Sequence, residues 1–279
     1  MGEKKEKRYL TLREIQEESL AILLDVHHFC EESGIRYFMA GGTLLGAARH
    51  QGFIPWDDDV DLFMLRPDYD RFIASYQSQK YHLLTMDNDP DYFLAYAHVV
   101  DMDRTVIEYN YDPFTRASSG IKIDIFPLES VPDDETAFDA QYAVGMKLWK
   151  RFNYARKALW HFSLSRPLKY NWNLLKKKIR TRNGRTLFDL NREIDANARK
   201  YPYGSSSYVG LVCVPLERAK QRHLLKHFAE TVYLDFEGYK LCAPVGYKEV
   251  LTTAFGPDYM QLPPVEKRKG THLMKVYYK

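Results

Sequence analysis

Residues 38–61 read FMAGGTLLGAARHQGFIPWDDDVD, and this stretch decides which fold the chain adopts. Its first part predicts a short apolar strand over residues 35–40, then a turn at Gly41-Gly42 and a helix that Thr43 caps and Gly52 ends. Its second part predicts a strand over residues 53–65, interrupted near its start by Pro55. A strand, a glycine turn, a helix and a second strand therefore follow one another without a long loop.

The second predicted strand has four carboxylates within five residues: Asp57, Asp58, Asp59 and Asp61. Alternation along a strand would place Asp57, Asp59 and Asp61 on one face. Two like charges ~5 Å apart repel by about 3 kcal/mol at an effective dielectric of 20. A half-buried strand keeps such charges when a cation lies among them, and oxygen ligands of this kind suit Mg²⁺ or Mn²⁺. The alternative that this run leaves open is a solvated acidic turn after Pro55.

A further carboxylate stands on a strand predicted over residues 120–126. Strand alternation places three isoleucines on one face of it and Lys122, Asp124 and Phe126 on the other. The apolar neighbours of Asp124 predict burial, and a buried carboxylate needs a partner. A metal ion held by Asp59 and Asp61 would be that partner.

This layout resembles the nucleotidyltransferase superfamily, and residues 38–61 closely resemble the LicD family of phosphocholine transferases, to which the fukutin-related protein is also similar. Residues 123–128 (IDIFPL) resemble the third-carboxylate motif of that family. Three stretches resemble its C-terminal motif, at residues 236–238 (FEG), 254–260 (AFGPDYM) and 262–264 (LPP). The resemblance implies an α+β fold, with a nucleotidyltransferase-like mixed β-sheet core flanked by helices.

The same resemblance implies transfer of a phospho-alcohol, phosphocholine first, from CDP-choline or a similar CDP-alcohol, with release of CMP. The expected acceptor is a hydroxyl of a cell-surface glycan or lipid-linked glycan, such as a teichoic acid or lipopolysaccharide precursor. The expected ligands of Mg²⁺ or Mn²⁺ are Asp59, Asp61 and Asp124. Asp57 completes the expected catalytic set, and Asp124 is the candidate for base or second metal ligand. We expect the backbone amides of the glycine turn to bind phosphate, because amides at a helix N-terminus point at a bound anion, and we expect nearby polar side chains to assist. The expected phosphate-binding residues are Gly41, Gly42, Thr43, Arg49 and Lys122.

The middle of the sequence is strongly basic. From Ala140 to Phe188 there are thirteen Lys and Arg residues and no Asp or Glu, although the net charge of the whole chain is only +3. Aromatic residues interleave with these charges, a mixture typical of a helix on an anionic membrane surface. A helical subdomain with an aromatic core and solvated charges is the alternative; no nucleic-acid reading motif accompanies the charge. We expect a catalytic core of residues 1–133 plus 205–279, and a basic aromatic helical subdomain at 134–204 on the acceptor or membrane side.

Other features bound the cellular context and leave rival functions open. Three scattered cysteines contain no CxxC pair, the N-terminus lacks a secretory pattern, and no apolar run approaches the ~18 residues of a membrane span. We therefore expect a cytoplasmic protein, or one at the inner face of the plasma membrane. The rival functions are nucleotidyl transfer from an NTP to a small molecule or sugar, and transfer of ribitol or glycerol phosphate. A non-catalytic nucleotide-binding role is disfavoured because all three metal positions hold a carboxylate.

Overall fold

The computed structural model describes residues 7–89, 92–108, 120–158, 168–182, 187–215, 218–220, 222–270 and 275–279. Within these residues, a seven-stranded mixed sheet has the order β1-β2-β6-β4-β3, and β7 and β8 continue from the far end of β6. Its strands are β1 (Phe38–Met39), β2 (Asp61–Leu65), β3 (His82–Leu84), β4 (Ala97–Asp101), β6 (Ile121–Val131), β7 (Tyr208–Gly210) and β8 (His223–Leu224). The pairing of β2 with β6 is parallel, whereas the other pairs are antiparallel.

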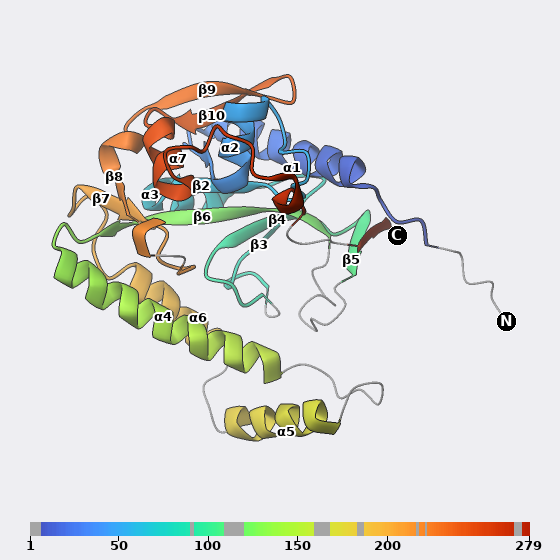
Figure 1. Ribbon diagram of the computed structural model, residues 1–279, viewed down its shortest axis with the longest axis vertical. Coiled ribbons are helices and arrows are strands. Elements are labelled where there is room, and N and C mark those ends of the chain that lie inside the picture. The colour runs from blue at the N-terminus through green and yellow to red at the C-terminus, as the bar shows by residue number, and fades with distance from the viewer. Residues whose placement is uncertain are drawn as a thin grey trace.

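Helices cover both faces of this sheet (Figure 1). One face carries α1 (Leu12–Ser33), α2 (Gly41–His50), α3 (Arg66–Ser75) and α7 (Tyr247–Phe255), together with the hairpin of β9 (Thr231–Phe236) and β10 (Tyr239–Pro244). The other face carries α4 (Glu135–Ala158) and α6 (Leu187–Ala198), and α5 (Leu168–Arg182) lies beyond them. A small sheet of β5 (Thr105–Glu108) and β11 (Lys275–Tyr278) stands at one end. The mixed helix and sheet content confirms the predicted α+β class.

Local sequence signals account for several of these elements. The α1 helix begins with a capping box, in which the Thr11 hydroxyl accepts the amide of Glu14 and the Glu14 carboxylate accepts the amide of Thr11. It ends at Gly34, whose φ of +60° is the left-handed conformation that glycine adopts freely. The predicted alternation of β6 is confirmed, since its isoleucines are buried while Lys122, Asp124 and Phe126 are half-buried.

Two predictions about the glycine-turn region were wrong. Of the predicted strand 53–65, only Asp61–Leu65 pairs as a strand, because a turn at Pro55 and Trp56 and an irregular stretch at residues 57–60 precede it. Asp57 and Asp59 therefore do not share a strand face with Asp61. The helix begins at Gly41 with Ala40 as its N-cap, three residues earlier than the predicted cap at Thr43. Thr43 lies inside the first turn of α2, and its hydroxyl accepts the backbone amide of Asp61 at 2.9 Å instead of capping the helix.

The helical layer of residues 135–198 shares its hydrophobic core with the sheet. Phe138 and Phe152 of α4 and Ile194 of α6 are buried in the same cluster as the isoleucines of β6. The sequence predicts helix over residues 135–181 with a break near Pro167, and residues 159–167 lie outside the described part of the chain. The division into a core of 1–133 plus 205–279 and a subdomain of 134–204 stays a prediction.

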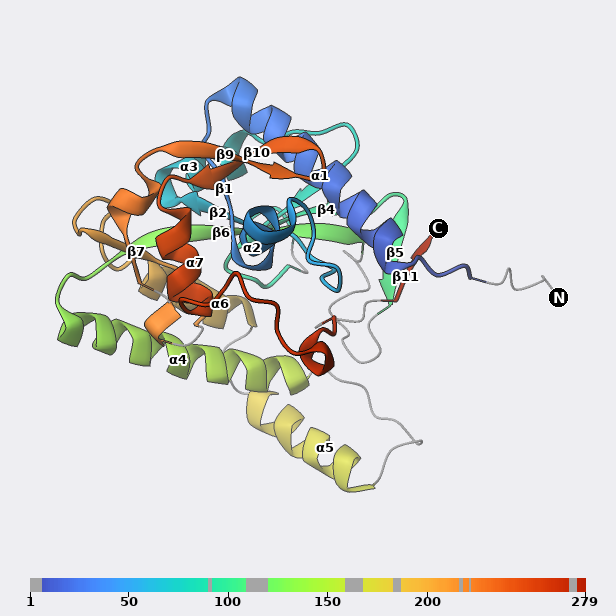
Figure 2. The ribbon, with the colours of Figure 1, turned by 45° about the horizontal axis from the view of Figure 1, so that its top comes forward.

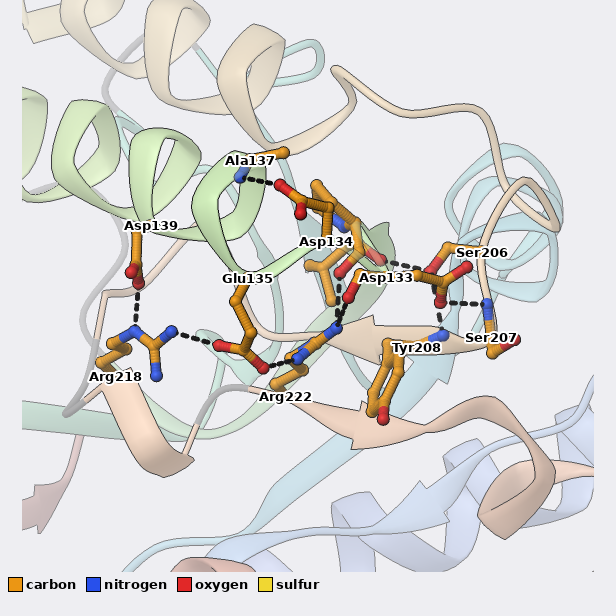
Figure 3. Close-up of polar contacts among 12 residues, drawn as sticks. Asp133, Asp134, Glu135, Ala137, Asp139, Ser206, Ser207, Tyr208, Arg218 and Arg222 are labelled. Carbon is orange, nitrogen blue, oxygen red and sulfur yellow. Dashed lines mark hydrogen bonds and ion pairs between the residues drawn. The ribbon is translucent and has the colours of Figure 1, made fainter.

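Polar contacts fasten the start of α4 to the segment around β7 and β8 (Figure 3). The Asp133 carboxylate accepts from the Ser206 hydroxyl and the Ser207 amide, each at 2.9 Å. Arg222 donates to Glu135 and stacks over the ring of Tyr208, with its guanidinium 3.7 Å from the ring centroid. These bonds join two stretches that are more than 70 residues apart in sequence. They fix the helical layer relative to the far end of β6.

Candidate active site

The two predicted metal carboxylates Asp61 and Asp124 lie side by side on adjacent strands. Asp61 begins β2, and the parallel register pairs it directly with Asp124 of β6. The backbone amide of Asp124 donates to the carbonyl of Val60 at 2.9 Å, which fixes this register just before the ladder begins. Because residues in register on one face of a sheet have their Cβ atoms about 5 Å apart, carboxylates from two distant parts of the chain meet here.

The irregular segment that precedes β2 adds three more carboxylates. Oxygens of Asp57, Asp58 and Asp59 lie within 4.8 Å of one another, and Asp58 is buried. The turn is held from behind by Gln16 of α1, whose side-chain amide donates to the Asp57 carbonyl at 2.8 Å. Gln16 is itself buried, so it fixes the backbone from which the acidic run projects.

The glycines at the start of α2 make room for these carboxylates. A Cβ added to Gly42 would lie 2.4 Å from Oδ2 of Asp57, and one added to Gly41 would lie 3.0 Å from Oδ2 of Asp61. Gly41 also has a φ of +50°, which side chains rarely tolerate. The start of α2, which is the positive end of its dipole, therefore lies close to the carboxylates of Asp57 and Asp61.

The electrostatics of the cluster favour a bound cation. Burial raises the pKa of Asp61 well above its ordinary value, and the neighbouring charges of Asp59 and Asp124 raise it further. Lys122 opposes this shift only in part. A divalent cation among these oxygens would offset the repulsion, and an all-carboxylate donor set is suited to Mg²⁺ or Mn²⁺. The side chains present therefore fit the predicted type of metal.

Asp124 has two nitrogen neighbours from its own sheet. The Lys122 ammonium forms an ion pair with its Oδ1 atom, and Nε2 of His98 lies 3.1 Å from the same oxygen. His98 stands opposite Asp124 in the antiparallel β4–β6 register. Burial, aided by the Lys122 charge and opposed by Asp124, lowers the pKa of His98 to about 3, so its imidazole is neutral near pH 7. His98 was not among the predicted site residues, since only the strand register brings it to Asp124.

Arg49, predicted to bind phosphate, contacts the C-terminal part of the chain. Its Nη1 atom donates to the carbonyls of Tyr259 at 2.9 Å and Gln261 at 3.1 Å. Arg268 continues this segment, with its guanidinium 5.9 Å from the ring centroid of Trp56. The segment therefore lies against both α2 and the residue that precedes the acidic run. The phosphate role of Arg49 stays a prediction, as do those of Thr43 and Lys122.

Glu237 joins the C-terminal motif to the loop after α2. Its carboxylate accepts the amide of Phe53 at 3.1 Å, and its own amide donates to the Gln51 carbonyl at 2.9 Å. A Cβ at Gly52 would lie 2.3 Å from Oε1 of Glu237, so a side chain there would push this carboxylate from its position. This contact links the Phe-Glu-Gly stretch at residues 236–238 to the glycine-rich stretch at residues 38–61, because the Glu237 carboxylate holds the loop that leads into the acidic run.

Among the residues that the structure describes, no helix is both long and apolar enough to cross a bilayer.

Comparisons of the sequence with known proteins identify a family and several relatives. The sequence profile for the nucleotidyltransferase domain of LicD, FKTN and FKRP matches residues 34–169. Over 96% of its length the chain is 31% identical to the lipopolysaccharide cholinephosphotransferase LicD of Haemophilus influenzae, of which the match covers 98%. It is also 66% identical over 32 residues to the human ribitol 5-phosphate transferase FKRP, a match that covers 12% of this chain and 6% of that protein. An uncharacterized protein of Rickettsia prowazekii is 45% identical over 47 residues, covering 17% of this chain and 18% of that protein.

Proposed function

Because the chain belongs to the LicD/FKTN/FKRP nucleotidyltransferase domain family, we propose that it transfers phosphocholine from CDP-choline to a hydroxyl of a glycan. That it is a LicD-like phosphotransferase follows from its full-length similarity to the named cholinephosphotransferase. The observation that supports the proposal most is the register that pairs Asp61 with Asp124, beside Asp57 and Asp59 and the start of α2. Release of CMP and dependence on a divalent metal are part of the proposal.

We assign Mg²⁺ or Mn²⁺ binding to Asp59, Asp61 and Asp124, with Asp57 as a further ligand beside Gly42. When bound, such an ion neutralises charge on the phosphates and on the leaving nucleotide. The chain's own part is to hold the carboxylates rigidly: Thr43 fixes the backbone amide of Asp61, and Gln16 fixes the turn at Asp57. The free amides at the start of α2 would bind phosphate oxygens.

The Asp124 carboxylate is the candidate for accepting the proton of the attacking hydroxyl. Its Oδ1 atom is in an ion pair with Lys122, which orients the carboxyl group, and Nε2 of His98 lies 3.1 Å from the same oxygen. We propose that Lys122 moves to a donor phosphate when substrate binds, since an ammonium on that face of β6 lies among the same acidic groups. Both roles require that Asp124 be ionised and accessible, and it is half-buried rather than sealed.

Calorimetric titration with CDP-choline, CDP-ribitol and CDP-glycerol tests the donor. We expect CDP-choline to bind in the presence of Mg²⁺, and Asp59→Ala and Asp61→Ala to abolish CMP release while the protein stays folded. Absence of binding to every CDP-alcohol would remove the donor assignment, and normal turnover by either variant would remove the metal assignment.

Ribitol phosphate transfer is the second candidate, supported by the short, highly similar match to a ribitol 5-phosphate transferase. A preference for CDP-ribitol in the same titration would favour it. Nucleotidyl transfer from an NTP would use the same carboxylates, and release of pyrophosphate instead of CMP would identify it. The cholinephosphotransferase match is preferred because it covers nearly the whole of both chains.

A further inference from the structure

The α5 helix (Leu168–Arg182) carries an apolar ridge that faces solvent. Leu168, Trp172 and Leu175 follow one another at spacings of four and three residues and so share one helix face. Their exposed fractions are 87%, 58% and 38%. With Lys169 and Asn171 they line a shallow hollow of about 560 Å³. We call these three residues the α5 ridge; a contiguous apolar surface of this kind marks a docking face.

Positive charge borders the α5 ridge. Lys169 and Lys176 are exposed, and the Lys176 ammonium lies 5.5 Å from the ring centroid of Trp172. The sequence of α5 also contains Lys177, Lys178, Arg180 and Arg182 and no acidic residue. The helix therefore combines an exposed apolar stripe and two exposed lysines with a sequence rich in further cations.

The helix stands at the periphery of the molecule. In both Figure 1 and Figure 2, α5 lies beyond α4, on the side away from the sheet that carries Asp61 and Asp124. Among the α5 side chains that the structure describes, Tyr170 and Asn171 are half-buried and the others are exposed, which leaves the ridge outside the core. A change on the ridge should therefore leave the sheet and its carboxylates in place.

We propose that α5 lies in the interface of an anionic lipid bilayer, with the ridge inserted among the acyl chains and the lysines against the headgroups. An amphipathic helix with this pattern binds membranes through buried apolar area and attraction to anionic lipids together. A second copy of this chain is a poorer occupant, because two α5 helices facing one another would bring many like charges together. This inference goes beyond the transfer reaction, and it places the enzyme where lipid-anchored acceptors are found.

Co-sedimentation of the whole chain with vesicles tests the inference, without donor or acceptor present. Vesicles of phosphatidylcholine with about one-third phosphatidylglycerol should bind the protein, pure phosphatidylcholine should bind it weakly, and high salt should release it. The tryptophan emission should shift to shorter wavelength on binding, and this shift should shrink in Trp172→Phe. Equal binding to neutral vesicles would overturn the charge argument.

Matched variants separate the ridge from general charge effects. Trp172→Asp should weaken vesicle binding at least tenfold, whereas Tyr239→Asp should not, although it makes the same charge change at an aromatic residue that is 46% exposed on the β9–β10 hairpin. Lys169→Gln with Lys176→Gln should weaken binding roughly 30-fold, at ~1 kcal/mol per charge. Circular dichroism checks that the variants are folded.

Wild-type vesicle binding by Trp172→Asp would overturn the proposal. So would a dimer in sedimentation velocity that Trp172→Asp dissolves, because the ridge would then be occupied by a second copy. Titration of Trp172→Asp with CDP-choline separates the two proposals. Loss of vesicle binding with retained CDP-choline binding would support the α5 proposal and leave the proposed reaction unaffected. If the wild-type chain does not bind CDP-choline, the proposed reaction fails, whereas the α5 proposal is still decided by the vesicle experiments.

Discussion

Replacing Gly42 by alanine should impair transfer while leaving the fold intact. The added Cβ would lie 2.4 Å from Oδ2 of Asp57, well inside van der Waals contact. That oxygen is the end of a side chain, so the carboxylate can rotate away without moving the backbone. Alanine also favours the helix over glycine by up to about 1 kcal/mol. The free energy of unfolding should therefore change by less than about 1 kcal/mol, while Asp57 leaves its position.

Displacing a group that supports a metal site costs roughly 10- to 100-fold in metal affinity or activity. The assay is kcat/KM for CMP release from CDP-choline at limiting Mg²⁺, measured beside thermal unfolding. Gly46→Ala is the matched control in the same helix, since its Cβ would lie 2.4 Å from the backbone carbonyl oxygen of Gly52, which cannot rotate away. That variant should lose about 1–3 kcal/mol of stability. A folded Gly42→Ala protein with wild-type kcat/KM and metal dependence would refute the reasoning.

In metal-free buffer, Asp61→Asn should unfold at a higher temperature than wild type yet be inactive. Burial and like charges raise the pKa of Asp61, so this carboxyl group destabilises the fold at pH values above the ordinary carboxyl pKa. A Tm of Asp61→Asn below that of the wild type would contradict this reasoning. Arg49→Lys should lower Tm, because lysine cannot reproduce both bonds to the Tyr259 and Gln261 carbonyls; a raised KM for donor at unchanged Tm would instead indicate a phosphate contact. Burial lowers the pKa of His223 to about 4, so the unfolded chain takes up the proton first. The stability that this group contributes is complete above about pH 6.5 and falls as the pH drops towards 4, by up to about 1.4 kcal/mol per pH unit. Urea unfolding across that range should show a shallower slope in His223→Gln, and an equal slope would count against this assignment.

Much of the site was predictable because its signals are local. A glycine turn before a helix, a dense run of aspartates and the alternation around Asp124 each occupy a few consecutive residues. The end of α1 at Gly34 is likewise set by a local signal, because glycine adopts the left-handed conformation freely. Period and short-range sterics fix such features without reference to the rest of the chain.

The errors arose where a residue's state depends on distant partners. Asp57 and Asp59 lie in an irregular segment rather than a strand, because Gln16 holds the Asp57 carbonyl from α1 and the parallel ladder with β6 begins only at Asp61. Thr43 was predicted as a cap from its place after two glycines, yet its hydroxyl bonds the Asp61 amide on another element. Neither contact leaves a signal in the local pattern.

The sequence by itself determined the family resemblance, the α+β class and the carboxylates that we propose for the chemistry. Only the tertiary structure decided that Asp124 stands in register with Asp61, that His98 and Lys122 flank it, and that Arg49 and Glu237 fasten the C-terminal segment to the glycine-rich stretch. The physical reason is that residue type and spacing act within a few residues, whereas strand register and buried polar pairing are set by how the whole sheet packs.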